Sequence, residues 1–283
     1  MTTWKYGFIP YHTESTDEAI DTLKQAGYDG VEWNLRLHVK TPANLKPLAE
    51  KTRRRNLEVC GLMASQDLVT KDDNLRKQRV DIIKKCIEAA KEASVAKVNV
   101  FTGPAEWAPD AAKIGQDITE GQAWTVVTDA FSDIVETAEK NSVTLTLEAA
   151  FGMLVHDYYT LQEFLRNFNS KQLAVTMDPS HLALYGNDPA WAVKRLGHKI
   201  KHVHMKDVIG KPGRLGESFT FPLLGDGIID WKNFLNALRE IDYDGFLSVE
   251  FEADNYLRSI WGGVWSKAAE ASKRQLDQLT NLT

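Results

Sequence analysis

Cysteine is scarce in this chain of 283 residues, which contains only Cys60 and Cys86. The two form neither a CxxC pair nor any other spaced metal-binding motif. A disulfide-stapled scaffold and a cysteine-based metal site are therefore excluded. Cys60 falls in an expected strand and Cys86 in an expected helix, so we expect both to be small buried hydrophobic residues.

Long apolar runs and an excess of basic residues are also missing. No stretch approaches the roughly 18 consecutive apolar residues of a membrane-spanning helix, and the first residues, MTTWKYG, do not resemble a signal peptide. Lys and Arg number 34 against 39 Asp and Glu, a formal net charge of −5, which offers no broad field to a nucleic-acid backbone. These absences predict a soluble, cytoplasmic protein with neither a membrane nor a nucleic acid as its partner.

Short β-rich segments alternate with segments of helical periodicity along the chain. The expected strands are Trp4–Ile9, Gly30–Asn34, Glu58–Met63, Val98–Phe101, Thr144–Glu148, Ala174–Asp178, Ile200–His204 and Leu247–Glu250. Such units favour a (β/α)8 TIM barrel, with residues 1–283 forming one domain that ends in a helix. An open doubly wound sheet is the runner-up, disfavoured because no GxGxxG motif follows an expected strand. Two long connections, residues 102–123 and 208–229, are expected to be loops that cover a site.

Side-chain alternation separates an apolar from a polar face in the late strands. In the fifth expected strand, Leu145 and Leu147 share one face, while Thr146 and Glu148 share the other. In a barrel the apolar face packs under the helices, so the small and ionisable residues point toward the interior. Glu32 in the second expected strand follows the same alternation.

Four ionisable residues on this inward face lie at or near the carboxyl ends of four consecutive expected strands: Glu148, Asp178, His204 and Glu250. Active sites of barrels are built at that end. Three carboxylates and an imidazole crowded together would repel one another and lose hydration unless a cation neutralised them. We therefore expect a divalent metal ion as cofactor, Mn²⁺ in the first place, with Mg²⁺, Co²⁺ or Zn²⁺ as alternatives.

The order of the motifs around these residues resembles that of the xylose-isomerase-like sugar phosphate isomerase/epimerase superfamily, whose fold is the TIM barrel. The matching segments are Leu147-Glu148, Met177-Asp178-Pro179-Ser180-His181, His202-Val203-His204-Met205-Lys206-Asp207, Leu224-Gly225-Asp226-Gly227-Ile228-Ile229-Asp230-Trp231 and Val249-Glu250-Phe251-Glu252. The resemblance implies that Glu148, Asp178, His204 and Glu250 bind the metal and that His181 contacts a substrate oxygen. It also implies that Glu148 and Glu250 are catalytic and exchange a proton on opposite faces of one substrate carbon, through an enediolate.

Two departures from the epimerase pattern leave the reaction open. Leu154 stands where several epimerases carry a further glutamate, with His156 close by, and an arginine common after the seventh-strand histidine is replaced in the segment Ile209-Gly210-Lys211. We expect Lys206, His156 and Arg214 to contact the substrate in place of these groups.

The expected function is a metal-dependent sugar isomerase or epimerase acting on a small keto-sugar or polyol. A lyase or dehydratase, such as an inosose dehydratase, could use the same metal and intermediate. A remote alternative is an apurinic-endonuclease-like nuclease, but the third and fourth expected strands end in Met63-Ala64 and Phe101-Thr102, without the additional histidines of those enzymes. Trp107 is expected to contact substrate, and both Trp107 and Trp261 are candidates for covering the site or joining subunits. We expect a homo-oligomer, either a dimer or a tetramer.

Overall fold

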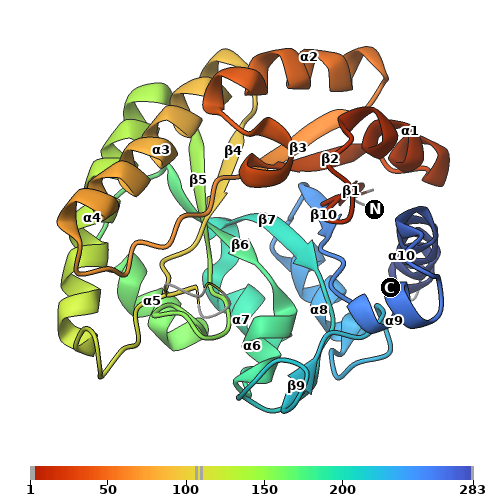
Figure 1. The fold of residues 1–283 in the computed structure, drawn as a ribbon. Helices are drawn as coiled ribbons and strands as arrows, with labels where there is room; N and C mark the ends of the chain where they lie inside the picture. The colour runs from red at the N-terminus through yellow and green to blue at the C-terminus, as the bar shows by residue number, and fades with distance from the viewer. Residues whose placement is uncertain (1–3, 106–107, 109–110, 282–283) are drawn as a thin grey trace.

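The computed structural model describes residues 4–105, 108 and 111–281. Its main sheet has eight parallel strands in the order β1-β10-β7-β6-β5-β4-β3-β2. These strands are β1 (Lys5–Phe8), β2 (Gly30–Asn34), β3 (Glu58–Met63), β4 (Lys97–Val100), β5 (Thr144–Glu148), β6 (Leu173–Met177), β7 (Ile200–Met205) and β10 (Phe246–Val249). Every expected strand is present, with its bounds within one residue of the prediction. Helices surround the strands (Figure 1), which confirms the predicted (β/α)8 barrel.

The two edges of the sheet meet where β1 approaches β2. No ladder joins these two strands in the described part of the chain. Instead the backbone N–H of Tyr6 donates to Asp29 Oδ2 over 2.8 Å, and the backbone N–H of Asp29 donates to the Tyr6 carbonyl over 2.9 Å. Because Asp29 directly precedes β2, this pair of bonds brings the edges together and nearly closes the barrel.

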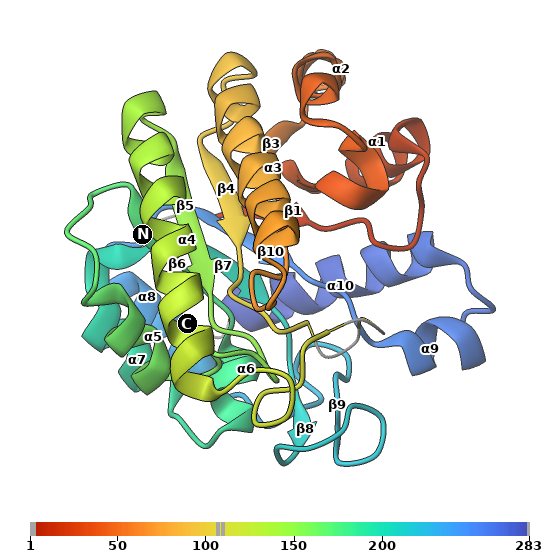
Figure 2. The same ribbon diagram turned by 60° about the vertical axis from the view of Figure 1, so that its left-hand side comes forward.

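The helices are α1 (Thr16–Ala26), α2 (Leu45–Arg54), α3 (Asp73–Glu92), α4 (Glu120–Asn141), α5 (Tyr158–Leu165), α6 (Pro179–Leu184), α7 (Pro189–Leu196), α8 (Trp231–Glu240), α9 (Asp254–Ser259) and α10 (Trp265–Thr280). Helical turns also occur at Leu35–Val39, Pro42–Asn44 and Gly197–Lys199. The pair α3 and α4 lies on the outside of the barrel (Figure 2), and α10 returns to pack against α1. Among the described residues, no helix combines the length and apolar character needed to span a membrane.

The strand faces follow the predicted alternation. Leu145 and Leu147 are fully buried in the apolar core under the helices, and Thr146 is fully buried on the opposite face. Cys60 and Cys86 are buried and unpaired, as expected. The barrel therefore has an apolar layer outside the strands and polar side chains inside them.

The two long connections differ from each other. After β4, helix α4 begins only at Glu120, so a long connection is confirmed. The segment 208–229, which we expected to be a loop, contains a short antiparallel ribbon of β8 (Ile209–Gly210) and β9 (Phe219–Thr220). A Cβ atom on Gly210 would lie 2.3 Å from the Ser218 carbonyl oxygen, so the ribbon requires glycine at this position.

Candidate functional site

Polar side chains inside the barrel are hydrogen-bonded to one another. Asn99 Nδ2 donates to Glu148 Oε2 over 3.1 Å, and Thr176 Oγ1 donates to Asn99 Oδ1 over 3.0 Å. Ser248 Oγ on β10 donates to Glu32 Oε2 on β2 over 2.9 Å. Since β10 and β2 are not neighbours in the sheet, this last bond crosses the barrel interior.

Six ionisable side chains meet at the carboxyl ends of the strands from β5 to β10. We call them the carboxyl-end cluster: Glu148, Asp178, His181, His204, Lys206 and Glu250. One ligand atom from each of Glu148, Asp178, His181 and Glu250 lies within 4.8 Å of the others. His204 Nδ1 lies 2.8 Å from Glu148 Oε1 and 3.5 Å from Glu250 Oε2. No member is more than 6% exposed.

The two carboxylate oxygens of Asp178 have different roles. Its Oδ1 accepts hydrogen bonds from the backbone N–H of Ser180 at 2.8 Å and from Ser180 Oγ at 2.7 Å, which caps helix α6. Pro179 is the first residue of that helix, where its missing N–H causes no loss. Asp178 Oδ2 is buried and makes no well-aligned hydrogen bond to the described residues, but the Lys206 ammonium lies 3.1 Å away. One oxygen thus caps a helix while the other faces a positive charge.

The ammonium group of Lys206 lies within this cluster. Its Nζ is 2.5 Å from Glu250 Oε2 and 3.1 Å from Asp178 Oδ2. It is also 3.1 Å from Glu252 Oε2 and 3.2 Å from His181 Nε2. Lys206 therefore provides a positive charge to the carboxylates in this structure.

The close charges shift several pKa values. Burial lowers the pKa of Lys206, but the carboxylates of Asp178 and Glu250 outweigh it and hold that pKa well above its usual value. Burial raises the pKa of Glu250, but Lys206 and His204 together hold it well below the usual range. Burial, and then the charge of Lys206, lowers the pKa of His181 to about 3. At neutral pH, Lys206 and Glu250 are therefore charged and His181 is neutral.

His204 connects the carboxyl-end cluster to a second group deeper in the barrel. We call that group the interior cluster: Glu32, His202 and Ser248. His204 Nε2 lies 3.4 Å from Glu32 Oε1, and His202 Nε2 lies 2.7 Å from Glu32 Oε2. Burial raises the pKa of Glu32, but His202 and His204 hold it well below its usual value. Glu32 is thus a charged carboxylate that is fully buried.

Asp207 is a site residue that sequence reasoning did not single out, although it stands in the HVHMKD motif. It is fully buried and bonds to the segment LGDGIIDW. Its carboxylate accepts from the backbone N–H groups of Val208, Gly225, Gly227 and Ile229 and from Trp231 Nε1, over 2.9 to 3.2 Å. A Cβ atom on Gly227 would lie 2.0 Å from Asp207 Oδ1, so only glycine fits there. Two sequence motifs are therefore parts of one hydrogen-bonded structure.

Tyr11 was also missed. Its O–H donates to Glu250 Oε1 over 2.9 Å. The position of Tyr11 in the sequence could have indicated its role. It lies just after the carboxyl end of β1, and the loops that follow barrel strands converge on one site.

The residues predicted to contact substrate fall into two groups. His181 and Lys206 lie in the carboxyl-end cluster, whereas His156 and Arg214 make their described contacts elsewhere. His156 Nδ1 lies 2.9 Å from the Met153 carbonyl oxygen. Arg214 is exposed on the ribbon segment and pairs with Glu217 at 2.8 Å. Trp107 lies outside the described residues.

An aromatic wall covers one side of the cluster. It consists of Phe151, Phe219 and Phe221, whose ring centroids lie 5.0 to 5.9 Å apart. Lys206 Nζ lies 4.7 Å from the centroid of Phe221, and the His181 ring lies 5.6 Å from that of Phe151. The 208–229 segment thus contacts the cluster through Phe221, which closely follows β9.

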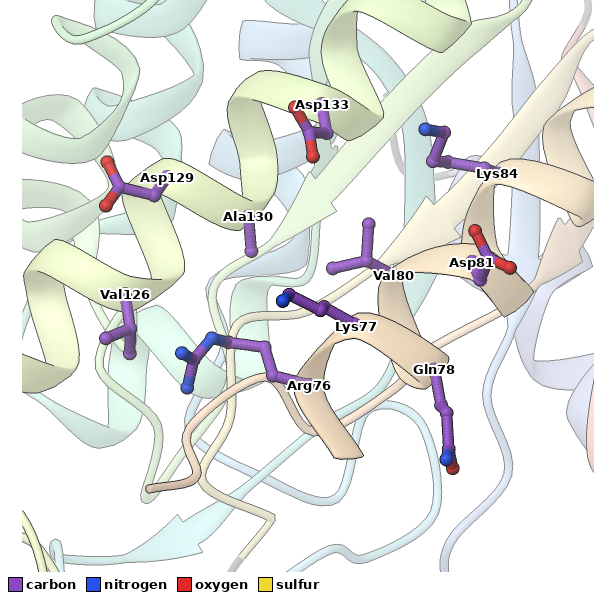
Figure 3. A pocket seen from close by; sticks show the side chains of 10 residues that line it. All are labelled: Arg76, Lys77, Gln78, Val80, Asp81, Lys84, Val126, Asp129, Ala130 and Asp133. Carbon is purple, nitrogen blue, oxygen red and sulfur yellow. The ribbon is translucent and has the colours of Figure 1, made fainter. Parts of the chain in front are cut away.

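A surface hollow lies elsewhere, between α3 and α4 on the outside of the barrel (Figure 3). Its charged residues have both signs: Arg76, Lys77, Lys84, Asp81, Asp129 and Asp133. Arg76 already contacts the Thr70 carbonyl and Asp73. The hollow shares no residue with the carboxyl-end cluster. The cluster, where buried ionisable side chains meet, is the candidate site.

The chain belongs to the family of xylose isomerase-like TIM barrels, whose model matches residues 20–280. An uncharacterized protein of Methanocaldococcus jannaschii, MJ1311, is 29% identical over 256 residues, which cover 86% of this chain and 80% of that protein. An inosose dehydratase of Clostridium botulinum is 23% identical over 257 residues, covering 84% and 82%.

Solved structures show the same relationship. The crystal structure of a D-tagatose 3-epimerase-like protein is 27% identical, with a TM-score of 0.73 and 98% of each chain covered. The crystal structure of an IOLI protein with a binding zinc atom has a TM-score of 0.76 at 20% identity, with 97% of each chain covered, which is a likeness of fold.

Proposed function

We propose that the protein is a divalent-metal-dependent isomerase or epimerase that moves a proton on a small keto-sugar or polyol. The observation that carries this proposal is the approach of Glu148 and Glu250 to a common centre with Asp178, within 4.8 Å. Strands β7 and β6 separate β10 from β5 in the sheet, so the two glutamates reach that centre from different sides. The family and the likeness to a D-tagatose 3-epimerase-like protein support the proposal.

The residues of the cluster fit a divalent cation. Glu148, Asp178 and Glu250 offer oxygen, and His204 Nδ1 offers nitrogen, a donor set that suits Mn²⁺ and related ions. The buried Asp178 Oδ2 makes no well-aligned hydrogen bond to the described residues and already faces a positive charge, the Lys206 ammonium at 3.1 Å, as an oxygen of a cation site would. When bound, the ion would stabilise negative charge that develops on a substrate carbonyl oxygen.

The two glutamates are held by different partners. Asn99 Nδ2 donates to Glu148 over 3.1 Å, while Lys206 Nζ and the Tyr11 O–H donate to Glu250 over 2.5 and 2.9 Å. In the proposed reaction one glutamate removes the proton beside the substrate carbonyl, and the other delivers a proton to the opposite face. If the first glutamate instead delivered the proton to the former carbonyl carbon, and the neighbouring oxygen became the carbonyl, aldose and ketose would interconvert.

A lyase or dehydratase reaction is the second candidate, and the environment of Lys206 favours it. Loss of a β-hydroxyl group from the same enediolate needs a proton donor beside the leaving oxygen. Lys206 Nζ and His181 Nε2 lie 3.2 Å apart within the cluster, and Leu154 is buried and apolar where several epimerases have a glutamate. The inosose dehydratase relatives support this candidate.

Turnover in D₂O with Mn²⁺ tests both candidates against a panel of ketoses and inososes. Epimerisation or isomerisation would place solvent deuterium on the carbon beside the carbonyl, whereas dehydration would give an unsaturated ketone that absorbs in the ultraviolet. We expect activity to disappear after dialysis against EDTA and to return with Mn²⁺. A protein that exchanges no deuterium and forms no unsaturated product with any substrate would contradict the proposal.

A further inference from the structure

Glu32 is a fully buried carboxylate with no lysine or arginine partner among the described residues. Its contacts are two histidines and a serine. Oε2 accepts from His202 Nε2 at 2.7 Å and from Ser248 Oγ at 2.9 Å, and His204 Nε2 lies 3.3 Å from Oε2 and 3.4 Å from Oε1. A buried carboxylate is unfavourable unless hydrogen bonds satisfy it, and here side chains from β7 and β10 supply the donors to a glutamate on β2.

His202 has a defined tautomer in this arrangement. Its Nδ1 is buried and has no hydrogen-bond partner among the described residues, while Nε2 faces the Glu32 carboxylate. The proton of a neutral ring therefore belongs on Nε2, where it can be donated. His202 and Ser248 both contact Oε2, and His204 Nε2 lies almost equally far from the two carboxylate oxygens, 3.3 Å from Oε2 and 3.4 Å from Oε1.

The orientation of His204 decides what it offers to the carboxyl-end cluster. A neutral imidazole has one N–H and one lone pair. Both ring nitrogens of His204 face carboxylates in the metal-free protein, Nδ1 that of Glu148 at 2.8 Å and Nε2 that of Glu32 at 3.3 to 3.4 Å, so each can donate a proton. A cation bound between Glu148 and Glu250 would take the place of the Nδ1 proton, and the N–H that remains would then be the one on Nε2, which faces Glu32. The opposite tautomer would set a lone pair against Glu32 and an N–H against the cation.

We propose that Glu32 is a positioning residue that holds the proton of His204 on Nε2 and so presents the Nδ1 lone pair to the metal. The inference rests on the proposed metal site and adds the residue that orients one of its ligands. Outer partners of this kind fix the tautomer of a ligating histidine, and losing one weakens metal affinity by about 10- to 100-fold.

The substitution Glu32→Gln tests this role with Zn²⁺ alone, titrated at neutral pH by calorimetry. We expect about 10- to 100-fold weaker binding, because the amide no longer restricts the His204 proton to Nε2. Glu58→Gln is the control for charge, since Glu58 is exposed and pairs with Lys5 at 2.5 Å; its affinity should equal that of the parent. Ser248→Ala removes one donor to Glu32 without touching His204, and its loss should be smaller than that of Glu32→Gln.

Long-range ¹H–¹⁵N spectra of the histidine rings provide a second measurement. In the Zn²⁺-loaded parent, His204 should carry its proton on Nε2 and bind through Nδ1. Binding through Nε2 would overturn the inference even if Glu32→Gln fails to fold, as would a folded Glu32→Gln protein that binds Zn²⁺ as tightly as the parent. A parent that binds no metal would overturn the proposed function and this inference together. A metal-binding parent without turnover would count against the proposed reaction alone.

Discussion

The two halves of the barrel contribute differently to the candidate site. The later strands, from β5 to β10, end in or beside the residues that we propose to bind metal and move protons: Glu148, Asp178, His204 and Glu250. The earlier half, from β1 to β4, contributes groups that hydrogen-bond to those residues: Tyr11, Glu32 and Asn99. The difference separates residues that would take part in chemistry from residues that hold them in place.

The sharpest test of this comparison substitutes one residue from each half. Glu250→Gln should lower the rate of deuterium exchange by about 10²- to 10⁴-fold, the usual contribution of a general acid or base. Asn99→Leu removes the amide donor to Glu148 and should cost about 10- to 100-fold, since a hydrogen bond to a charged group contributes about 1.5 to 3 kcal/mol. Equal losses from the two substitutions would show that the halves do not differ in this way.

Asp207→Asn tests whether the later half also depends on a purely structural carboxylate. The amide would set its own N–H groups against backbone donors of the segment 225–229, so we expect a loss of about 3 kcal/mol in the free energy of unfolding. Urea denaturation monitored by circular dichroism would measure it. Asp226→Asn, an exposed substitution on the same segment, should leave the stability unchanged.

The stability of the metal-free protein should depend on the neutral state of His181. Its pKa is lowered from 6.5 to about 3 by burial and by Lys206, so between these values the unfolded chain binds a proton that the folded chain does not. Stability should therefore decrease as pH falls through 6.5, by roughly 3 kcal/mol at pH 4.5. Denaturation in EDTA across this range would show a shallower dependence in His181→Asn, and an unchanged slope would contradict the assignment.

Lys206→Met addresses the positive charge within the later half. If the ammonium competes with a metal ion for Glu250 and Asp178, its removal should tighten Mn²⁺ binding by about tenfold. A tenfold change is smaller than the full interaction energy of two opposite charges at this distance. Calorimetry would measure the change, with Lys211→Met, an exposed lysine after β8, as the control. Weaker binding in Lys206→Met would show that the lysine supports the metal site.

Local patterns in the sequence are sufficient to predict much of the barrel. The bounds of β2, β3 and β5 agree with the prediction at every residue, because strand length and side-chain alternation are set by neighbouring residues. The same alternation places Glu148 and Glu32 inside the barrel. In α1, Ser15 caps the start and Gly27, at φ 83°, ends the helix where its spacing ends.

Contacts between distant residues could not be predicted in this way. Nothing local indicates that Asp207 bonds to Gly225 and Trp231, that Tyr11 reaches Glu250, or that the 208–229 segment forms a ribbon. These contacts depend on barrel closure, which brings β1 beside β10 and the loops of all strands to one end.

The sequence by itself determined the alternating elements, the polar interior and the four strand-end residues proposed to bind metal, since each of these follows from periodicity or motif order. Tertiary structure alone decided that Lys206 lies among the carboxylates, and that His204 faces Glu32 with one nitrogen and Glu148 with the other. The physical reason is that local periodicity sets the face on which a side chain lies, while its partners across the barrel depend on how separate strands are brought together.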